Sequence, residues 1–188
     1  MRITRNHIQD TIELPLSLDK GSLIDFETTG FPWINGCEIV TLGYFSNNDI
    51  VITQRRTRTK HDYYVEISKI LDSLPRPFFS YNTLFEGSVM RNLLNISVQP
   101  DLLVDIMKPW RRKAEAKGMK WPKLDELMSE PEDYFKDQKI CGKDIPKMWS
   151  TYLKVGTESY LKRIMEHCLS DMLREAILLL RYHPSSAI

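Results

Sequence analysis

Two acidic residues separated by one position follow a short apolar run near the start of the chain. The segment reads Leu23-Ile24-Asp25-Phe26-Glu27 and continues into Thr28-Thr29-Gly30. Side chains alternate between the two faces of a strand, so Asp25 and Glu27 are predicted to share one face. Two carboxylates aimed at one point repel each other, and a hard divalent cation between them is the usual remedy. The segment therefore predicts metal-assisted phosphoryl chemistry, beside a glycine that lets a ligand approach the backbone.

Further carboxylates must come from other elements if Asp25 and Glu27 hold a metal ion. Glu86 follows the segment Tyr81-Asn82-Thr83-Leu84-Phe85, where an apolar run passes into the start of a predicted helix. An acid in a first helical turn is ordinarily a favourable partner of the helix dipole. Glu86 is thus a candidate ligand, and the ordinary role stays open for it.

The second candidate ligand is Asp171, in a long helix predicted near the end of the chain. At about 100° per residue, Asp171 lies at the margin of the apolar stripe of this helix and not on its solvent face. A carboxylate in that position has to be paired, protonated or bound to a metal ion. His167 precedes it by one turn on the same side, as i, i+4 neighbours do. A lone histidine beside an apolar stripe is usually structural, but the neighbouring acid favours a functional pair.

The elements that would position these residues follow from hydrophobic spacing and turn residues. Strands are predicted at Leu23–Thr28, Glu38–Phe45, Asp49–Thr53, Pro77–Tyr81 and Leu102–Met107, with turns at 30–32 and 46–49. Helices are predicted at Tyr63–Leu74, Phe85–Leu94, Lys123–Met128, Ile145–Leu153 and Glu158–Arg181. Strands first and helices later predict an α/β layered fold on one core. The polar segment Ser129–Ile145 is left unassigned, either as a cap over the cleft or as a long surface connection.

Composition limits the class of protein. The 188 residues suit one domain, and we expect a single domain over residues 1–188. A net charge of +1 means that any nucleic-acid footprint must be local. Three cysteines without a C-x-x-C pair suit a reducing cytoplasm better than a disulfide framework or a zinc site. The sequence shows neither a signal segment nor a long apolar run, so secretion and membrane insertion are not expected.

Order and placement of these residues resemble the DEDD superfamily of 3′–5′ exonucleases, whose members share a ribonuclease-H-like fold. Asp25-Phe26-Glu27-Thr28-Thr29-Gly30 is similar to the first motif, and Tyr81-Asn82-Thr83-Leu84-Phe85-Glu86 to the second, with Glu in place of Asp. His167 and Asp171 are similar to the third. The resemblance spans Gly21–Leu180 and is greatest to a branch of predicted ribonuclease-H-like exonuclease domains of bacteria and archaea. That branch also carries a strand-borne acid, which Asp105 resembles.

The resemblance implies a mixed sheet flanked by helices, in which an antiparallel three-strand meander is followed by parallel strands. It implies two divalent ions, Mg²⁺ or Mn²⁺, on either side of the scissile phosphate. Their expected ligands are Asp25, Glu27, Glu86 and Asp171. His167 would orient or deprotonate the attacking water. Its four-residue spacing from Asp171 is usual for the Tyr subclass of the family, whereas the His subclass usually spaces by five, so the identity of the general base is left open.

The implied substrate is nucleic acid, DNA or RNA, attacked at a single-stranded 3′ end. The residues expected to contact it are Thr28, Thr29, Asn82, Phe85, Arg111 and Arg112. The two arginines belong to the basic segment Lys108–Lys123, in which Trp110 and Trp121 are interleaved, and such segments bind phosphates and unstacked bases. A solvated helix with extended lysine side chains explains this segment equally well. For the shorter cluster at residues 55–60, the solvated surface is the favoured interpretation.

Two alternatives remain open on the same fold. One is a catalytically silent module that binds nucleic acid or a partner protein, and the other is a structure-specific endonuclease. A full set of four acids argues against the silent module, because carboxylates that converge without a metal ion destabilise a fold. An open cleft without a stop for the terminal 3′-hydroxyl would favour the endonuclease.

Overall fold

A mixed sheet of five strands forms the centre of the computed structural model, which describes residues 2–4, 6–128 and 140–182. The strands are β1 (Arg2–Ile3), β2 (His7–Thr28), β3 (Ile39–Arg55), β4 (Phe78–Ser80) and β5 (Leu103–Asp105). β2 pairs antiparallel with both β1 and β3, whereas β4 pairs parallel with β2 and with β5. The predicted combination of antiparallel and parallel strands flanked by helices is confirmed.

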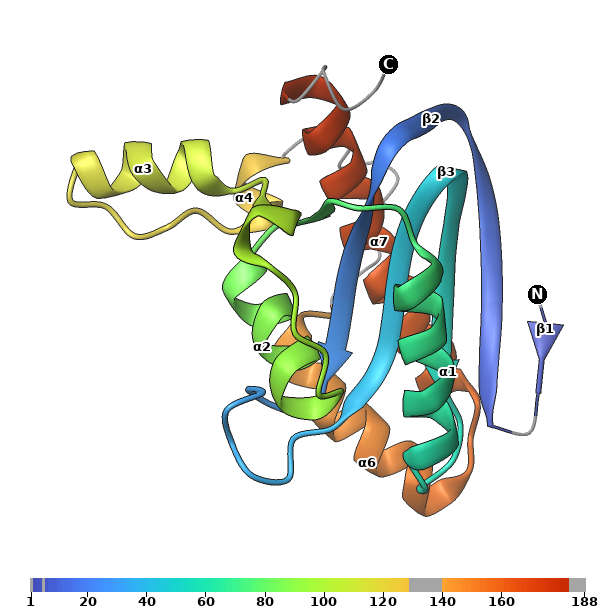
Figure 1. Ribbon diagram of the computed structural model, residues 1–188. Helices are drawn as coiled ribbons and strands as arrows, with labels where there is room; N and C mark the ends of the chain where they lie inside the picture. Colours follow the sequence, from blue (N-terminus) through green and yellow to red (C-terminus); the bar gives the residue numbers. More distant parts are fainter. Residues whose placement is uncertain (1, 5, 129–139, 183–188) are drawn as a thin grey trace.

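β2 and β3 are both longer than predicted. The first part of β2, which the sequence analysis did not predict, pairs with the second part of β3, from His7 opposite Arg55 to Glu13 opposite Asp49. Its last part pairs with the first part of β3, from Leu23 opposite Phe45 to Thr28 opposite Ile39. β3 therefore joins the two strands predicted at 38–45 and 49–53, and its ribbon folds over between its two parts (Figure 1). Asn47, inside the predicted turn, has a positive φ of 54°.

Six helices in the described part of the chain flank the sheet. They are α1 (His61–Ser73), α2 (Thr83–Leu93), α3 (Lys108–Ala116), α4 (Leu124–Leu127), α6 (Ile145–Val155) and α7 (Ser159–Tyr182), with short 3-10 turns at Pro100–Leu102 and Gly142–Asp144. All five predicted helices are present within a few residues of their expected ends, and α3 is an addition. Most of the unassigned segment Ser129–Ile145 lies outside the described residues. Among the described helices, none has the length and apolar character needed to cross a membrane.

Side chains near the end of β2 alternate between the two faces of the sheet and pack into two separate core clusters. Leu23 packs in a cluster with Cys168 and Met172 of α7, whereas Ile24 and Phe26 pack in another cluster with residues of α1. The two helices cover opposite faces of the sheet (Figure 1). Because side chains alternate, Asp25 and Glu27 share the face of Leu23 and point toward α7.

Gly43 permits the close approach of α7 to the sheet. It lies opposite Asp25 in the pairing of β2 with β3. A Cβ atom at this position would lie only 2.7 Å from Cys168 Sγ and 2.8 Å from Met172 Cγ. Those distances are shorter than van der Waals contact, so any side chain here would push α7 off the strands. The missing side chain therefore brings the middle of α7 next to Asp25.

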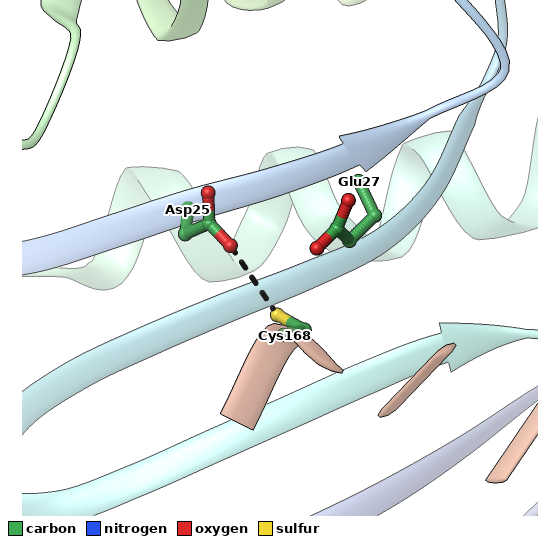
Figure 2. A group of neighbouring side chains, drawn as sticks. All are labelled: Asp25, Glu27 and Cys168. Carbon is green, nitrogen blue, oxygen red and sulfur yellow. Dashed lines mark hydrogen bonds between the residues drawn. The ribbon is translucent and has the colours of Figure 1, made fainter. Parts of the chain in front are cut away.

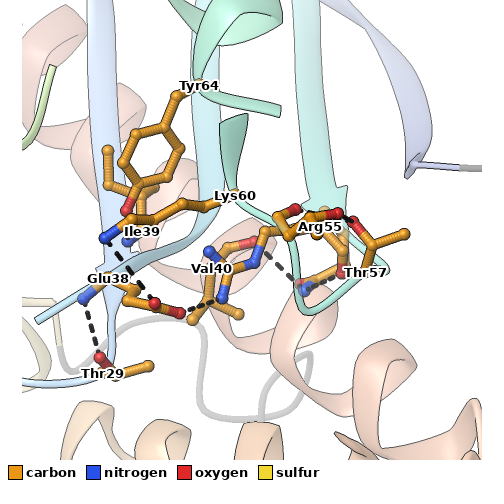
Figure 3. Close-up of polar contacts among 10 residues, drawn as sticks. Thr29, Glu38, Ile39, Val40, Arg55, Thr57, Lys60 and Tyr64 are labelled. Carbon is orange, nitrogen blue, oxygen red and sulfur yellow. Dashed lines mark hydrogen bonds and ion pairs between the residues drawn. The ribbon is translucent and has the colours of Figure 1, made fainter. Parts of the chain in front are cut away.

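A buried arginine fixes the base of the loop that follows Glu27. The guanidinium of Arg55 is fully buried, pairs with Glu38 at 2.5 Å, and lies 4.5 Å from the ring centroid of Trp149 in α6. The backbone N–H of Glu38 donates to Thr29 Oγ1 at 2.9 Å, and the N–H of Thr29 donates to the carbonyl of Glu38 at 2.9 Å (Figure 3). The two ends of loop 29–38 are thus joined beside the acidic strand end.

Candidate metal centre

Asp25 and Glu27 point from the end of β2 toward α7, where Cys168 faces them (Figure 2). The thiol donates to Asp25 Oδ2 at an Sγ–Oδ2 distance of 3.6 Å. One ligand atom from each of the three residues lies within 4.8 Å of the others. Burial, followed by the charges of Asp25 and Glu27, raises the pKa of the Cys168 thiol well above 9. Cys168 therefore stays a neutral donor that holds the Asp25 carboxylate in one orientation.

His167 and Asp171 approach the same strand end from α7. His167 Nε2 lies 3.5 Å from Glu27 Oε1 and 3.7 Å from Asp171 Oδ2, and the ring is almost fully buried. The other oxygen of Asp171 accepts a hydrogen bond from Arg174 Nη1 at 2.9 Å. The helical spacing of four residues thus places the imidazole between a strand acid and a helix acid.

Glu86 reaches the centre from the start of α2. β4 runs parallel to β2, so the chain leaves β4 at the same end of the sheet as Asp25 and enters α2 there. The Glu86 side chain is only 5 % exposed, and its Oε2 has no hydrogen-bond partner among the described residues. A surface residue that only complements a helix dipole would be hydrated. The buried, unpartnered oxygen instead fits a metal ligand.

The carboxylates of this centre repel one another. Burial, followed by the charge of Asp171, raises the pKa of Asp25 to about 7. Burial and then the charges of Asp25, Asp171 and Glu86 raise the pKa of Glu27 well above its usual value. Burial and the charge of Asp25 do the same for Glu86. Carboxylate oxygens are the ligands that Mg²⁺ and Mn²⁺ prefer, so the residues present fit hard divalent cations.

A fifth acid lies near this centre and was missed in the sequence. Glu175 follows Asp171 by one turn of α7 and is only 4 % exposed. Burial, followed by the charges of Asp25, Glu86 and Asp171, raises its pKa well above the usual value for a glutamate. Its helical position was an available signal, because residues 168, 172 and 175 fall on one stripe. An acid inside an apolar stripe is as informative as one at its margin.

The residues predicted to contact the terminal nucleotide make hydrogen bonds and packing contacts within the loops around the centre. Thr28 Oγ1 donates to the carbonyl of Gly30 at 2.6 Å, and the Thr29 hydroxyl accepts the Glu38 N–H described above. The carbonyl of Asn82 accepts the Phe85 N–H at 2.8 Å where α2 begins, and the Phe85 ring packs against the core. Contacts of these residues with a nucleotide stay a prediction.

The two predicted arginines lie outside the acidic centre, on α3. Arg111 pairs with Asp105 at 2.6 Å, and its guanidinium lies 5.0 Å from the ring centroid of Trp121. Asp105, the acid that resembles a family position, is therefore neutralised by Arg111. Arg112 is exposed and borders a hollow of about 590 Å³ between the starts of α2 and α3. The structure thus brings together Asp25, Glu27, Glu86, His167 and Asp171, and Arg111 is paired with Asp105, whose charge acts on Glu86.

The chain was compared with known protein families and with curated proteins. Residues 23–181 match the family model described as RNase H superfamily. The matched range begins in β2 just before Asp25 and ends near the end of α7, so it contains every residue of the acidic centre. No curated protein matches the chain.

Proposed function

The chain belongs to the RNase H superfamily, and we propose that it is a metal-dependent 3′–5′ exonuclease that hydrolyses phosphodiester bonds of nucleic acid. Membership supports a nuclease fold that acts on nucleic acid. The observation that carries the finer proposal is that Asp25, Glu27, Glu86 and Asp171, from three elements, lie close enough for their charges to raise the pKa values of Asp25, Glu27 and Glu86. Such a cluster is costly to the fold without cations, so its presence favours catalysis over a silent module.

The four acids would hold two divalent ions, Mg²⁺ or Mn²⁺, which supply a nucleophilic water and neutralise charge on the phosphate. His167 Nε2, 3.5 Å from Glu27 Oε1, is placed to accept a proton from that water or to orient it. Cys168 would keep the Asp25 carboxylate directed at the ions through its hydrogen bond. The protein groups thus divide ion binding, orientation and proton transfer among themselves.

Exposed aromatic rings beside the centre support a single-stranded substrate. Phe31 and Trp33 follow the acidic motif directly, and their rings stack with centroids 4.9 Å apart and planes inclined by 10°. They are 55 % and 61 % exposed, so their faces are accessible to a ligand. Aromatic faces of this kind stack on unpaired bases, whereas bases in a duplex are already stacked. We therefore propose that the enzyme engages an unpaired 3′ end.

A basic helix offers the phosphate contacts that the acidic centre lacks. α3 projects away from the sheet and the other helices (Figure 1). Its exposed cations are Lys108, Arg112 and Lys113. Positive charges at that distance from the acids can neutralise the backbone of the strand that leads into the site. We propose that α3 holds the substrate upstream of the cleaved end.

The proposal is tested with a 5′-labelled single-stranded oligonucleotide, as DNA and as RNA, in Mn²⁺, in Mg²⁺ and in EDTA. We expect a ladder that shortens from the 3′ end only when metal is present, and slower shortening of the same strand in a blunt duplex. Asp171→Asn serves as the inactive control. Internal cuts would replace the exonuclease by an endonuclease. Binding without cleavage in any metal would support the silent module.

His167→Ala is expected to lower kcat by about 100-fold, the usual contribution of a positioned acid or base. KM and Mn²⁺ affinity should change far less, because the four carboxylates remain. Steady-state rates, compared with those of the surface variant His61→Ala, check this. An unchanged kcat would assign proton transfer to another group.

A further inference from the structure

We propose that Glu175 is a fifth carboxylate of the metal centre and would supply a ligand to a divalent cation there, together with Asp25 and Glu86. The inference deepens the proposed function, on which it rests. It assigns a role to a residue that none of the three motif resemblances includes.

The fold directs Glu175 into the centre. It lies on α7 one turn beyond Asp171, and on the same stripe as Cys168 and Met172, the two residues that pack against Gly43. Only 4 % of Glu175 is exposed. The backbone N–H of Tyr81 favours the ionised form of the Glu175 carboxyl group. Tyr81 begins the turn that carries Glu86, so Glu175 lies next to that turn.

One oxygen of each glutamate lacks a partner. Glu86 Oε2 and Glu175 Oε2 are both buried, and within the described residues neither has a hydrogen-bond donor or acceptor. Buried polar atoms are nearly always paired, so two orphaned oxygens in one acidic centre point to a missing group. A divalent cation can satisfy both, because both atoms are carboxyl oxygens, the ligands that hard cations prefer.

An ionised Glu175 is costly in this position. Its Oε2 has no donor in the described part of the chain, and an unpaired charge in a buried position costs free energy. A divalent cation removes the cost in one step, because it coordinates the ionised oxygen and offsets the neighbouring charges of Asp25 and Glu86. These neighbours are the acids whose charges act on Glu175 most strongly after its burial.

The test is a calorimetric titration of the full chain with MnCl₂ in the absence of nucleic acid, for the wild type and for Glu175→Gln. Gln has nearly the same shape and keeps an acceptor for the Tyr81 N–H. We expect at least about a tenfold loss of affinity at one Mn²⁺ site, since even an outer partner of a metal site is worth 10- to 100-fold. The rise in thermal unfolding temperature on adding Mn²⁺ should shrink as well, while without metal the variant should be at least as stable as the wild type.

Glu166→Gln is the matched control, because it makes the same substitution on the same helix. Glu166 forms a surface ion pair with Lys162 at 3.8 Å, outside the centre, so this variant should bind Mn²⁺ as the wild type does. A wild type that binds no Mn²⁺ would overturn the proposed metal centre itself. Wild-type binding with equal affinity in Glu175→Gln would overturn the role of Glu175 alone. If the Gln variant does not fold, Glu175→Asp keeps the charge and shortens the reach, and unchanged affinity in that variant would overturn the role.

Discussion

Asp25→Asn is expected to abolish cleavage and, in the absence of metal, to make the protein more stable. Asp25 would be a metal ligand, and loss of such a ligand removes several kcal/mol of transition-state stabilisation, which is about 10³-fold or more in rate. Without metal the same carboxylate only repels its neighbours, since its charge raises the pKa of both Glu27 and Glu86. A neutral Asn ends this repulsion and still accepts the Cys168 thiol, so the free energy of unfolding should rise by about 1–2 kcal/mol.

Two measurements check this pair of effects. Initial rates on the labelled oligonucleotide in Mn²⁺ give the activity, and urea unfolding in EDTA at neutral pH gives the stability. Asp72→Asn, at an exposed position of α1, is the control and should change neither quantity. An Asp25→Asn variant that keeps a tenth of the activity, or that unfolds at a lower urea concentration than the wild type, would contradict the assignment of Asp25 as a metal ligand.

The metal-free protein is expected to lose stability as the pH rises from about 4 to about 7. Burial and the charge of Asp171 raise the pKa of Asp25 from 3.8 to about 7 in the folded state. Between these values the unfolded chain has released the proton while the folded protein still binds it, so stability falls with rising pH and levels off above about 7. The shift of Asp25 corresponds to an upper bound of roughly 4 kcal/mol at 1.36 kcal/mol per pKa unit. The raised pKa values of Glu27 and Glu86 act in the same direction.

Urea midpoints in EDTA across this pH range measure the effect. Saturating Mn²⁺ should abolish or reverse the slope, because the cation replaces the proton on the carboxylates and binds more tightly as they ionise. His7 acts in the opposite direction, since burial lowers its pKa. The slope of the urea midpoint against pH should be shallower for Asp25→Asn than for the wild type. This difference isolates the contribution of the acidic centre, because His7 is present in both proteins. Metal-free stability that rises steadily from pH 4 to pH 7 would show that the acids do not converge.

Local periodicity predicted the last part of β2 and both parts of β3 but missed most of β2, which begins at His7. Leu23–Thr28 and the two parts of β3 have apolar residues at strand spacing, and the structure has strands there. The earlier part of β2 carries the same signal, since Ile8, Ile12, Leu14, Leu16 and Leu18 recur at even intervals. Pro15 interrupts that series, and a proline argues against a strand interior. The long pairing with β3 outweighs this local signal.

The site could be predicted where one element sets the geometry by itself. The two-residue period of a strand places Asp25 beside Glu27, and the turn of a helix places His167 near Asp171. Glu86 depends on the parallel pairing of β4 with β2, which no local pattern encodes. The sequence marked it as an acid at the start of a predicted helix, and the motif resemblance gave it a role as a ligand. Glu175 has no counterpart in those motifs, and only its place on the apolar stripe of the last helix could have indicated it.

The packing of α7 against Gly43 determines when the acidic centre is completed during protein synthesis. Asp25 and Cys168, which share a hydrogen bond in the finished centre, are 143 residues apart in the chain. A ribosome makes the strand acids early and the α7 residues late, and contacts over such separations are among the last to form. Until α7 has emerged and settled into the space left by the glycine, the nascent chain holds only part of the acid set. If the chain is the nuclease proposed above, a growing polypeptide would therefore carry no assembled cleavage site.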